Sequence, residues 1–287
     1  MRLTAATTTE APPVAVQIRA LVQKGELSLP PLPELATRLL ALLRDEDRAD
    51  LNSAGALIEN EPVMAASVLR MANSASFGGL RRLDNLGEAV GRLGLRQVSS
   101  LVTAVSHRGH FESSDPERTR SLRTLWDHAV ATALVSKNLA ALQGAELAES
   151  FLAGLLHDTG KLLVLKGADH LEARAGATPL GAGAVEELMD LLHCELGHLT
   201  LTQWRIPEPI CNVARRHHDA TPGDDALLAR VQVGDAVARK LGASLHPDPE
   251  LNLLEVPAVE VLDIGDLELA ALMVDVEEEY DRVRQLF

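Results

Sequence analysis

The chain has 287 residues and a net charge of −14, with 46% apolar but only 2% aromatic residues. This apolar content is ample for one large core or two smaller ones, which argues against wholesale disorder, and the scarcity of aromatic residues favours packed helices over sheets. The acidic balance disfavours binding to nucleic acid, since a phosphate backbone is neutralised by clustered Lys and Arg.

The sequence also bears on the cellular setting. Cys194 and Cys211 are the two cysteines, too few for a disulfide framework and without zinc-ribbon spacing. No run of about 18 uncharged apolar residues is present to span a membrane. The N-terminus has no basic and then apolar layout of a signal peptide. We therefore expect a cytoplasmic protein that does not engage a membrane.

The first part of the chain is predicted to be a lead-in followed by a helical lobe. Residues 1–28 are rich in Thr, Ala and Pro and are expected to be loose, apart from a short amphipathic piece. Beyond them apolar residues recur with helical spacing, as where Leu35, Leu39 and Leu42 share one face. We expect short antiparallel helices over residues 29–110.

Several helix ends in this lobe follow from local signals. One helix should begin near Asn52, and the next should take Asn60 as its N-cap and end in the region 73–79. Gly94 should stop a further helix and precede another one. The apolar face before Gly94 consists of Leu86, Ala89, Val90 and Leu93.

The polar stretch 108–120 reads as a boundary before a second helical lobe over residues 118–245. An acidic helical segment over 246–287 is expected to pack on this domain. The most obvious loop is 176–185, and no stretch alternates as a strand would. The predicted fold is all-α, a two-lobed helical bundle. Helices are predicted after the boundary at about 120–143, 146–157, 185–204, 207–218, 224–241 and 266–286. His157 and Asp158 are expected to end the second of these helices, with Gly160 terminating it.

Several of the ten histidines occupy apolar helices. A single histidine of this kind is usually a hydrogen-bonded core residue, and a lone buried aspartate usually caps a helix or pairs with Arg. Several imidazoles and two carboxylates on separate helices, however, can converge in a bundle core to bind metal. The candidate ligands are His128, His157, Asp158, His193, His217, His218 and Asp235.

Mixed nitrogen and oxygen ligation suits Fe, Mn, Mg or Zn, so the predicted cofactor is a divalent metal. A water held by such a metal has a lowered pKa and can hydrolyse phosphoesters. Gly197 lies four residues after His193, which leaves a side-chain-free patch for close backbone approach on the same face. The alternative for His157 and Asp158 is a neutral structural cap without metal.

The order of His128, His157-Asp158 and Asp235 resembles the HD superfamily of metal-dependent phosphohydrolases, and GLLHDTGK is similar to its short motif. The additional His193 and His217-His218 resemble the ligand set of HD-GYP cyclic di-GMP phosphodiesterases. Over residues 25–287 the chain is most similar to the HDOD domain of bacterial signalling proteins. The motifs in the first half are LPPLPELATRLLALL, ENEPVMAASVLRMANSASFGG and NLGEAVGRLGLRQVSSLV. Those in the second half are LWDHAVATA, ESFLAGLLHDTGKLLVL, HCELGHLTLTQWRIPEPICNVARRHH and VQVGDAVARKLG.

The HDOD resemblance implies a two-lobed all-α fold, often joined to receiver or GGDEF/EAL modules. Many members have lost the HD ligands and act as interaction modules, whereas this chain matches all seven positions. It has DATPGDD where HD-GYP enzymes carry Gly-Tyr-Pro, which counts against cyclic di-GMP hydrolysis. Thr124 replaces a Glu and counts against a third metal. Lys161 is expected to contact phosphate as in the superfamily, with a solvated helix-end lysine as the alternative.

Two functions follow from these features. The first is a signalling module of the HDOD type that acts through interactions with other signalling proteins or domains, near the lobe junction, and retains a metal site. The second is a metal-dependent phosphohydrolase of nucleotides or cyclic dinucleotides, with His128, His157, Asp158 and Asp235 as ligands. A nucleotide is a candidate ligand in either case.

The remaining polar and aromatic residues receive structural roles. Trp204 is expected to anchor the packing of the two lobes, and Cys194 to be a small core residue rather than a ligand. Surface or structural positions are assigned to His107, His110, His170, His198 and His246.

Overall fold

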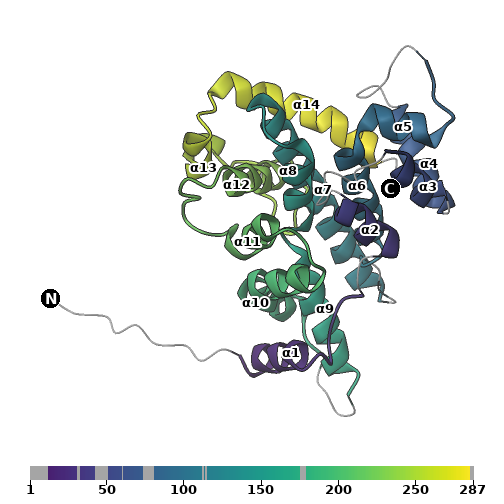
Figure 1. The fold of residues 1–287 in the computed structure, drawn as a ribbon. Helices are drawn as coiled ribbons and strands as arrows, with labels where there is room; N and C mark the ends of the chain where they lie inside the picture. The colour runs from purple at the N-terminus through teal and green to yellow at the C-terminus, as the bar shows by residue number, and fades with distance from the viewer. Residues whose placement is uncertain are drawn as a thin grey trace.

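The structure of the protein is a computed structural model that describes residues 12–30, 33–42, 51–59, 61–73, 81–111, 113, 115–174 and 179–284. Helices dominate these ranges, and no strand occurs within them (Figure 1). The all-α prediction is confirmed. No helix in the described part of the chain is both long enough and apolar enough to cross a bilayer.

The first helices are short and amphipathic. In α5, residues Leu86 and Leu93 lie on a buried face, and Asn85 caps the helix by accepting a hydrogen bond from the Glu88 amide. Gly94 has a φ of 80° between α5 and α6, which confirms the predicted stop. These helices are α1 (Pro13–Gln23), α2 (Glu34–Leu42), α3 (Leu51–Glu59), α4 (Pro62–Ala72), α5 (Leu86–Leu93) and α6 (Leu95–Arg108).

The structure bears on two predictions about the N-terminal part. The N-cap of α4 is Glu61 rather than Asn60, which lies outside the described residues, as does most of the predicted helix end at 73–79. The short amphipathic piece expected within the lead-in is helix α1, whose Ile18 is fully buried over Gly167 of α9. Figure 1 shows α1 beside α9 and α10, away from α3, α4 and α5.

The second half begins with the long helix α7, against which α8, α12 and α14 pack. Its helices are α7 (Pro116–Leu142), α8 (Leu147–Leu156), α9 (Thr159–Glu172), α10 (Ala182–Gln203), α11 (Glu208–Arg216), α12 (Ala226–Lys240), α13 (Pro257–Val261) and α14 (Asp266–Arg284), with a 3₁₀ turn at Leu253–Glu255.

Helix α9 is the main departure from the prediction. Gly160 was expected to terminate the helix before it, but it is the second residue of α9, and the stretch 159–172 is helical. The reason is packing. Gly160 and Gly167 are sites where neighbouring elements come close, so they do not act as helix breakers here.

Small residues also set the distance between α7 and its two neighbours. A Cβ on Gly154 of α8 would lie 2.7 Å from the Cα atom of Ala133, and one on Gly234 of α12 would lie 2.8 Å from the carbonyl oxygen of Thr132. Both helices therefore approach the same turn of α7. His157 lies three residues after Gly154 and Asp235 directly follows Gly234, so this contact brings them close to His128, one turn earlier on α7.

The last helix packs back onto the second half. Lys137 of α7 donates a hydrogen bond to Glu279 of α14 at 2.5 Å, and Asn138 donates to the same carboxylate at 3.0 Å. Much of the acid in α14 is exposed, in keeping with a solvated helix face. The domain limits drawn from the sequence stay predictions.

Candidate metal centre

Separate helices contribute the predicted ligands to one interior region. His128 comes from α7 and Asp235 from α12, while His193 comes from α10. His157 is the C-cap of α8 and His217 the C-cap of α11, so both imidazoles project from helix ends. Asp158 lies between α8 and α9 as the N-cap of α9, but its side chain makes no capping hydrogen bond. The carboxylate therefore does not cap α9 and is available to the centre.

The Asp158 carboxylate lies between two pairs of imidazoles. Its Oδ2 atom is 3.6 Å from Nε2 of His128 and 3.4 Å from Nε2 of His157. Its Oδ1 atom is 3.5 Å from Nε2 of His193 and 3.4 Å from Nε2 of His217. The structure thus brings four of the predicted histidines around the carboxylate of Asp158, a residue that is only 7% exposed.

All four imidazoles turn the same ring nitrogen away from this carboxylate. The Nδ1 atoms face main-chain carbonyl oxygens, which only accept hydrogen bonds, so we assign the ring proton to Nδ1 in each case. The Nε2 atoms of His157, His193 and His217 then carry lone pairs toward Asp158, as in histidines whose second nitrogen orients them for a metal, whereas His128 Nε2 also faces the Asp235 carboxylate. The Nδ1 pairs are His128 with Ala243 at 2.9 Å, His157 with Gly154 at 2.6 Å, His193 with Met189 at 2.7 Å and His217 with Ala214 at 3.1 Å.

This arrangement leaves acceptors facing one another. The Nε2 atoms of His193 and His217 are 3.1 Å apart, and two lone pairs at that distance repel unless a proton or a cation lies between them. His157 Nε2 and Asp158 Oδ1 are buried and have no hydrogen-bond partner. A buried acceptor without a donor is costly, and a metal ion would satisfy these atoms together. The residues present therefore fit a divalent metal.

The protonation states agree with a ligand role. Burial lowers the pKa of His157 to about 3 and that of His193 to about 4, so both rings are neutral at pH 7. Burial would raise the pKa of Asp158, but Lys161 and the nearby histidines outweigh it and hold that pKa well below its usual value. Neutral imidazoles beside an ionised carboxylate are the forms that bind metal.

His128 differs from the other rings because a second carboxylate reaches it. Its Nε2 atom is 3.1 Å from Oδ1 of Asp235. Burial lowers the pKa of His128, but the hydrogen bond and charge of Asp235 outweigh this effect and the pKa is raised. The pKa of Asp235 is lowered in turn because His128 overcomes the effect of burial. The centre thus has two halves, one on each side of the Asp158 carboxylate. Asp235 belongs to the half on the Oδ2 side, with His128 and His157.

The half on the Oδ1 side of Asp158 contains Cys194, which was predicted from the sequence to be a core residue. The side chains of His193, Cys194, His217 and His218 each offer one ligand atom, and these four atoms lie within 4.8 Å of one another. Cys194 Sγ is 3.4 Å from Nε2 of His193, and burial raises the pKa of its thiol to about 11. The signal available in the sequence was its position directly beside His193.

Lys161 lies in the centre rather than in solvent. Its Nζ atom donates a hydrogen bond to Oδ2 of Asp158 at 2.5 Å, and its side chain is only 16% exposed. The alternative of a solvated helix-end lysine is therefore wrong. Contact with a phosphate stays a prediction for this residue.

A separate buried cluster lies next to the centre at the end of α6. His107 Nδ1 and His110 Nδ1 are 3.3 Å apart, and the His110 ring stacks on Trp204 at a centroid distance of 5.2 Å. His107 Nε2 is 3.4 Å from the hydroxyl of Thr159, the residue after Asp158. Trp204, at the C-cap of α10, thus packs on the last turn of α6, as its predicted role requires.

The other histidines lie away from the centre. His198 Nδ1 is 3.1 Å from the carbonyl oxygen of Cys211, while His170 and His246 are exposed. Thr124 bonds its own helix through the carbonyl oxygen of Arg120 at 3.3 Å.

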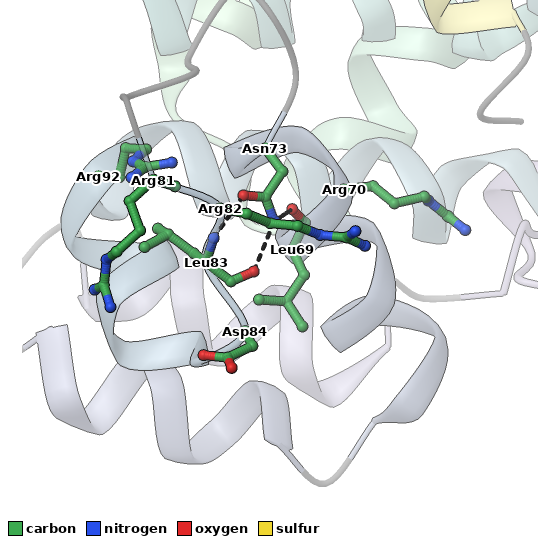
Figure 2. A pocket seen from close by; sticks show the side chains of 8 residues that line it. All are labelled: Leu69, Arg70, Asn73, Arg81, Arg82, Leu83, Asp84 and Arg92. Carbon is green, nitrogen blue, oxygen red and sulfur yellow. Dashed lines mark hydrogen bonds between the residues drawn. The ribbon is translucent and has the colours of Figure 1, made fainter.

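A cavity of about 910 Å³ lies in the N-terminal part, and Figure 2 shows the residues that line it. Asn73 supports its wall by donating to the carbonyl oxygens of Leu69 and Leu83 and accepting from the Leu83 amide. Arg92 donates to the carbonyl oxygens of Ala72 and Arg81. Arg70 and Arg81 extend in different directions in Figure 2, so the arginines do not converge on one point. This cavity is not the candidate site.

Comparison with known proteins places the chain in a family. Residues 29–220 match the HDOD domain. An uncharacterized protein of Treponema pallidum (strain Nichols) is 30% identical over 199 residues, which are 66% of this chain but only 38% of that protein. The chain thus spans about two fifths of the length of this relative.

Solved structures support the same fold. An HDOD domain protein of unknown function from Geobacter sulfurreducens has a TM-score of 0.75 at 24% identity, with 95% of this chain and 98% of that chain covered. A proposed metal-dependent phosphohydrolase from Shewanella amazonensis has a TM-score of 0.74 at 22% identity, with 93% and 96% covered. A proposed signal transduction protein from Marinobacter aquaeolei has a TM-score of 0.63 at 19% identity, with 95% and 65% covered. Since the HDOD match extends over more than half of its length, the chain belongs to the HDOD family.

Proposed function

We propose that this protein is a signalling module that holds a divalent metal at an HD-type centre and acts mainly through contacts with other signalling proteins. The observation that carries the metal assignment is the common orientation of four imidazoles, with Nδ1 on a main-chain carbonyl and Nε2 toward Asp158. Mixed imidazole and carboxylate ligation suits Fe, Mn or Zn, and Mg less well because it prefers oxygen ligands.

We expect metal binding at Asp158 to affect a partner-binding surface through Thr159. It directly follows Asp158, and its hydroxyl is 3.4 Å from Nε2 of His107 in the buried cluster with His110 and Trp204. A ligand bound by Asp158 therefore acts one residue away from the packing between α6 and the end of α10. This junction is where we expect a partner to sense the state of the centre.

Metal content is the first measurement. Protein purified without chelator or nickel resin is examined by elemental mass spectrometry, beside His157→Ala and Asp158→Asn. We expect about one to two equivalents of Fe, Mn or Zn in the wild type and a loss in both variants. His198→Gln is the matched control, since His198 shares α10 with His193 but bonds the carbonyl oxygen of Cys211. A wild-type protein that stays empty after Mn, Fe and Zn are added overturns the proposal.

Hydrogen exchange tests the signalling role separately from metal content. Hydrogen exchange of residues 107–111 and of the segment around Trp204 is compared between metal-loaded and chelated protein. The proposal expects slower exchange at this junction when metal is bound, because Asp158 and Thr159 are then fixed together. Unchanged exchange in a protein that binds metal contradicts an output at this site.

A second candidate function, hydrolysis of a phosphoester in a nucleotide or cyclic dinucleotide, is favoured by Lys161 beside Asp158. Bound metal would supply an activated water, and the Lys161 ammonium would orient the phosphate. Metal-loaded protein is assayed with nucleotides, cyclic dinucleotides and bis(p-nitrophenyl) phosphate. Turnover that disappears in Asp158→Asn and persists in His198→Gln would replace the non-catalytic module by this enzyme.

A further inference from the structure

We propose that Cys194 is a metal ligand, and that it completes a tetrahedral site with His193, His217 and His218 on the Oδ1 side of Asp158. The inference rests on the proposed metal centre and extends it, because it divides the centre into two halves with different metal preferences. One half has a thiol and three imidazoles. The other has His128, His157 and the carboxylates of Asp158 and Asp235.

The distances match the edges of a tetrahedron. With Zn–S bonds of about 2.3 Å and Zn–N bonds of about 2.0–2.1 Å, a tetrahedral zinc site has N···S edges of about 3.5 Å and N···N edges of about 3.3 Å. The structure has 3.4 Å between Cys194 Sγ and His193 Nε2, and 3.1 Å between the Nε2 atoms of His193 and His217. All four ligand atoms, including that of His218, lie within 4.8 Å of one another.

The orientation of the rings supports the same assignment. His193 and His217 direct their Nδ1 atoms to the carbonyl oxygens of Met189 and Ala214, so their Nε2 lone pairs converge beside the Cys194 sulfur. No proton donor lies between the two Nε2 atoms at 3.1 Å under this assignment, whereas a cation there removes the repulsion.

An independent feature points into this half of the centre. Asp158 Oδ1 is buried without a hydrogen-bond partner, and it lies 3.5 Å from Nε2 of His193 and 3.4 Å from Nε2 of His217. A buried carboxylate oxygen aimed at two ring acceptors indicates a positive charge between them. The Asp158 carboxylate would then lie between the two halves and could bridge their metals.

The ligand chemistry sets the metal class. A thiolate with imidazoles favours Zn or another borderline ion such as Co or Fe(II), while carboxylate-rich ligation is better suited to Mn or Mg. We therefore expect the half with Cys194 to retain zinc in the presence of excess Mg. The half with His128 and Asp235 should exchange its metal more readily.

Cobalt(II) tests the assignment directly, because its visible bands report tetrahedral binding and a thiolate ligand adds a near-ultraviolet charge-transfer band. Chelated full-length protein is titrated with Co(II) as wild type, Cys194→Ser and Cys194→Ala. We expect visible bands in all three and the charge-transfer band in the wild type alone, with zinc affinity lowered roughly tenfold or more in the variants. Cys211→Ser is the control and should keep the band, since the Cys211 thiol donates to the carbonyl oxygen of Ile206.

The outcomes separate this inference from the proposed function. Wild-type protein with visible cobalt bands but no charge-transfer band overturns the role of Cys194 and leaves the metal centre intact. Wild-type protein that binds no cobalt or zinc overturns the role of Cys194, and protein that also stays empty with Mn and Fe overturns both. The wild-type spectrum decides between these results even if a Cys194 variant does not fold.

Discussion

Gly160 of α9 lies directly against Gly197 of α10. A Cβ on Gly160 would be 2.6 Å from the Gly197 amide nitrogen and would also overlap the carbonyl oxygen of His193. The contact fixes where α9 begins relative to α10, and therefore the distance between Asp158, two residues before Gly160, and His193, four residues before Gly197. The geometry of the candidate metal centre thus depends on two residues that supply no ligand.

Gly160→Ala should accordingly damage both stability and metal binding. The new methyl group meets backbone atoms, which cannot move aside as a side chain can, so we expect a loss of at least about 2 kcal/mol in the free energy of unfolding and reduced metal content. Urea unfolding and elemental analysis measure the two effects. Gly183→Ala is the matched control on α10, since nothing lies within 4 Å of its Cβ position. Equal behaviour of the two variants would refute the steric role of Gly160.

Lys161→Met should destabilise the metal-free protein more than the metal-loaded protein. Lys161 pairs with the buried Asp158 carboxylate, and removing one partner of a buried ion pair costs about 3–5 kcal/mol. A bound divalent cation supplies the missing positive charge. Adding Zn or Mn should therefore remove most of the difference in unfolding free energy between Lys161→Met and the wild type. Urea unfolding with chelator and with metal measures this difference. Lys166→Met on the same helix is the comparison, and an equal loss with and without metal would count against a shared role of Lys161 and the cation.

His107 should make stability depend on pH outside the metal centre. Burial lowers the pKa of His107 to about 3, whereas an unfolded histidine titrates near 6.5. Between these values the unfolded chain binds the proton and the folded protein does not, so stability is fully present above about pH 6.5 and is lost as the pH falls. The expected loss is about 1.4 kcal/mol per pH unit in this window.

The measurement is urea unfolding of chelated protein from pH 7 to pH 4, for wild type and His107→Leu. The variant should show a shallower pH dependence by about one proton. The exposed His170, changed to Gln, serves as the control and should leave the wild-type slope unchanged. Parallel curves for wild type and His107→Leu would exclude His107 as the titrating group.

The sequence predicted most helices because their apolar spacing is regular, as in α5, and because stops such as Gly94 have a positive φ. It missed α9 because Gly160 was interpreted as a terminator. A glycine that serves a helix contact cannot be distinguished from a helix stop by local pattern alone. The close approach at Gly197 was predicted from spacing, but its partner Gly160 could only come from the three-dimensional fold.

The candidate ligands were identified by residue type, but their arrangement was not. The central place of Asp158 depends on how α8 and α9 meet. The proton positions depend on main-chain carbonyls such as that of Ala243, which carry no residue-specific signal. Cys194 was assigned to the core because a single thiol without a second cysteine nearby lacks a recognised spacing. The distances between side chains on α10 and α11 identify Cys194 as a candidate ligand, which its position beside His193 in the sequence does not.

The pairing of Lys161 with Asp158 has a consequence for the order in which ligands bind. With neutral His157 and His193, the two carboxylates of Asp158 and Asp235 are balanced by the Lys161 ammonium and by His128, whose pKa Asp235 raises, so the metal-free centre has no surplus positive charge. The C-terminal ends of α8 and α11 add negative potential where they reach the centre. An anionic phosphate is therefore repelled until a divalent cation reverses the sign. The centre should therefore bind metal first and phosphate second, so that its response to any phosphate-bearing ligand depends on the concentration of available metal.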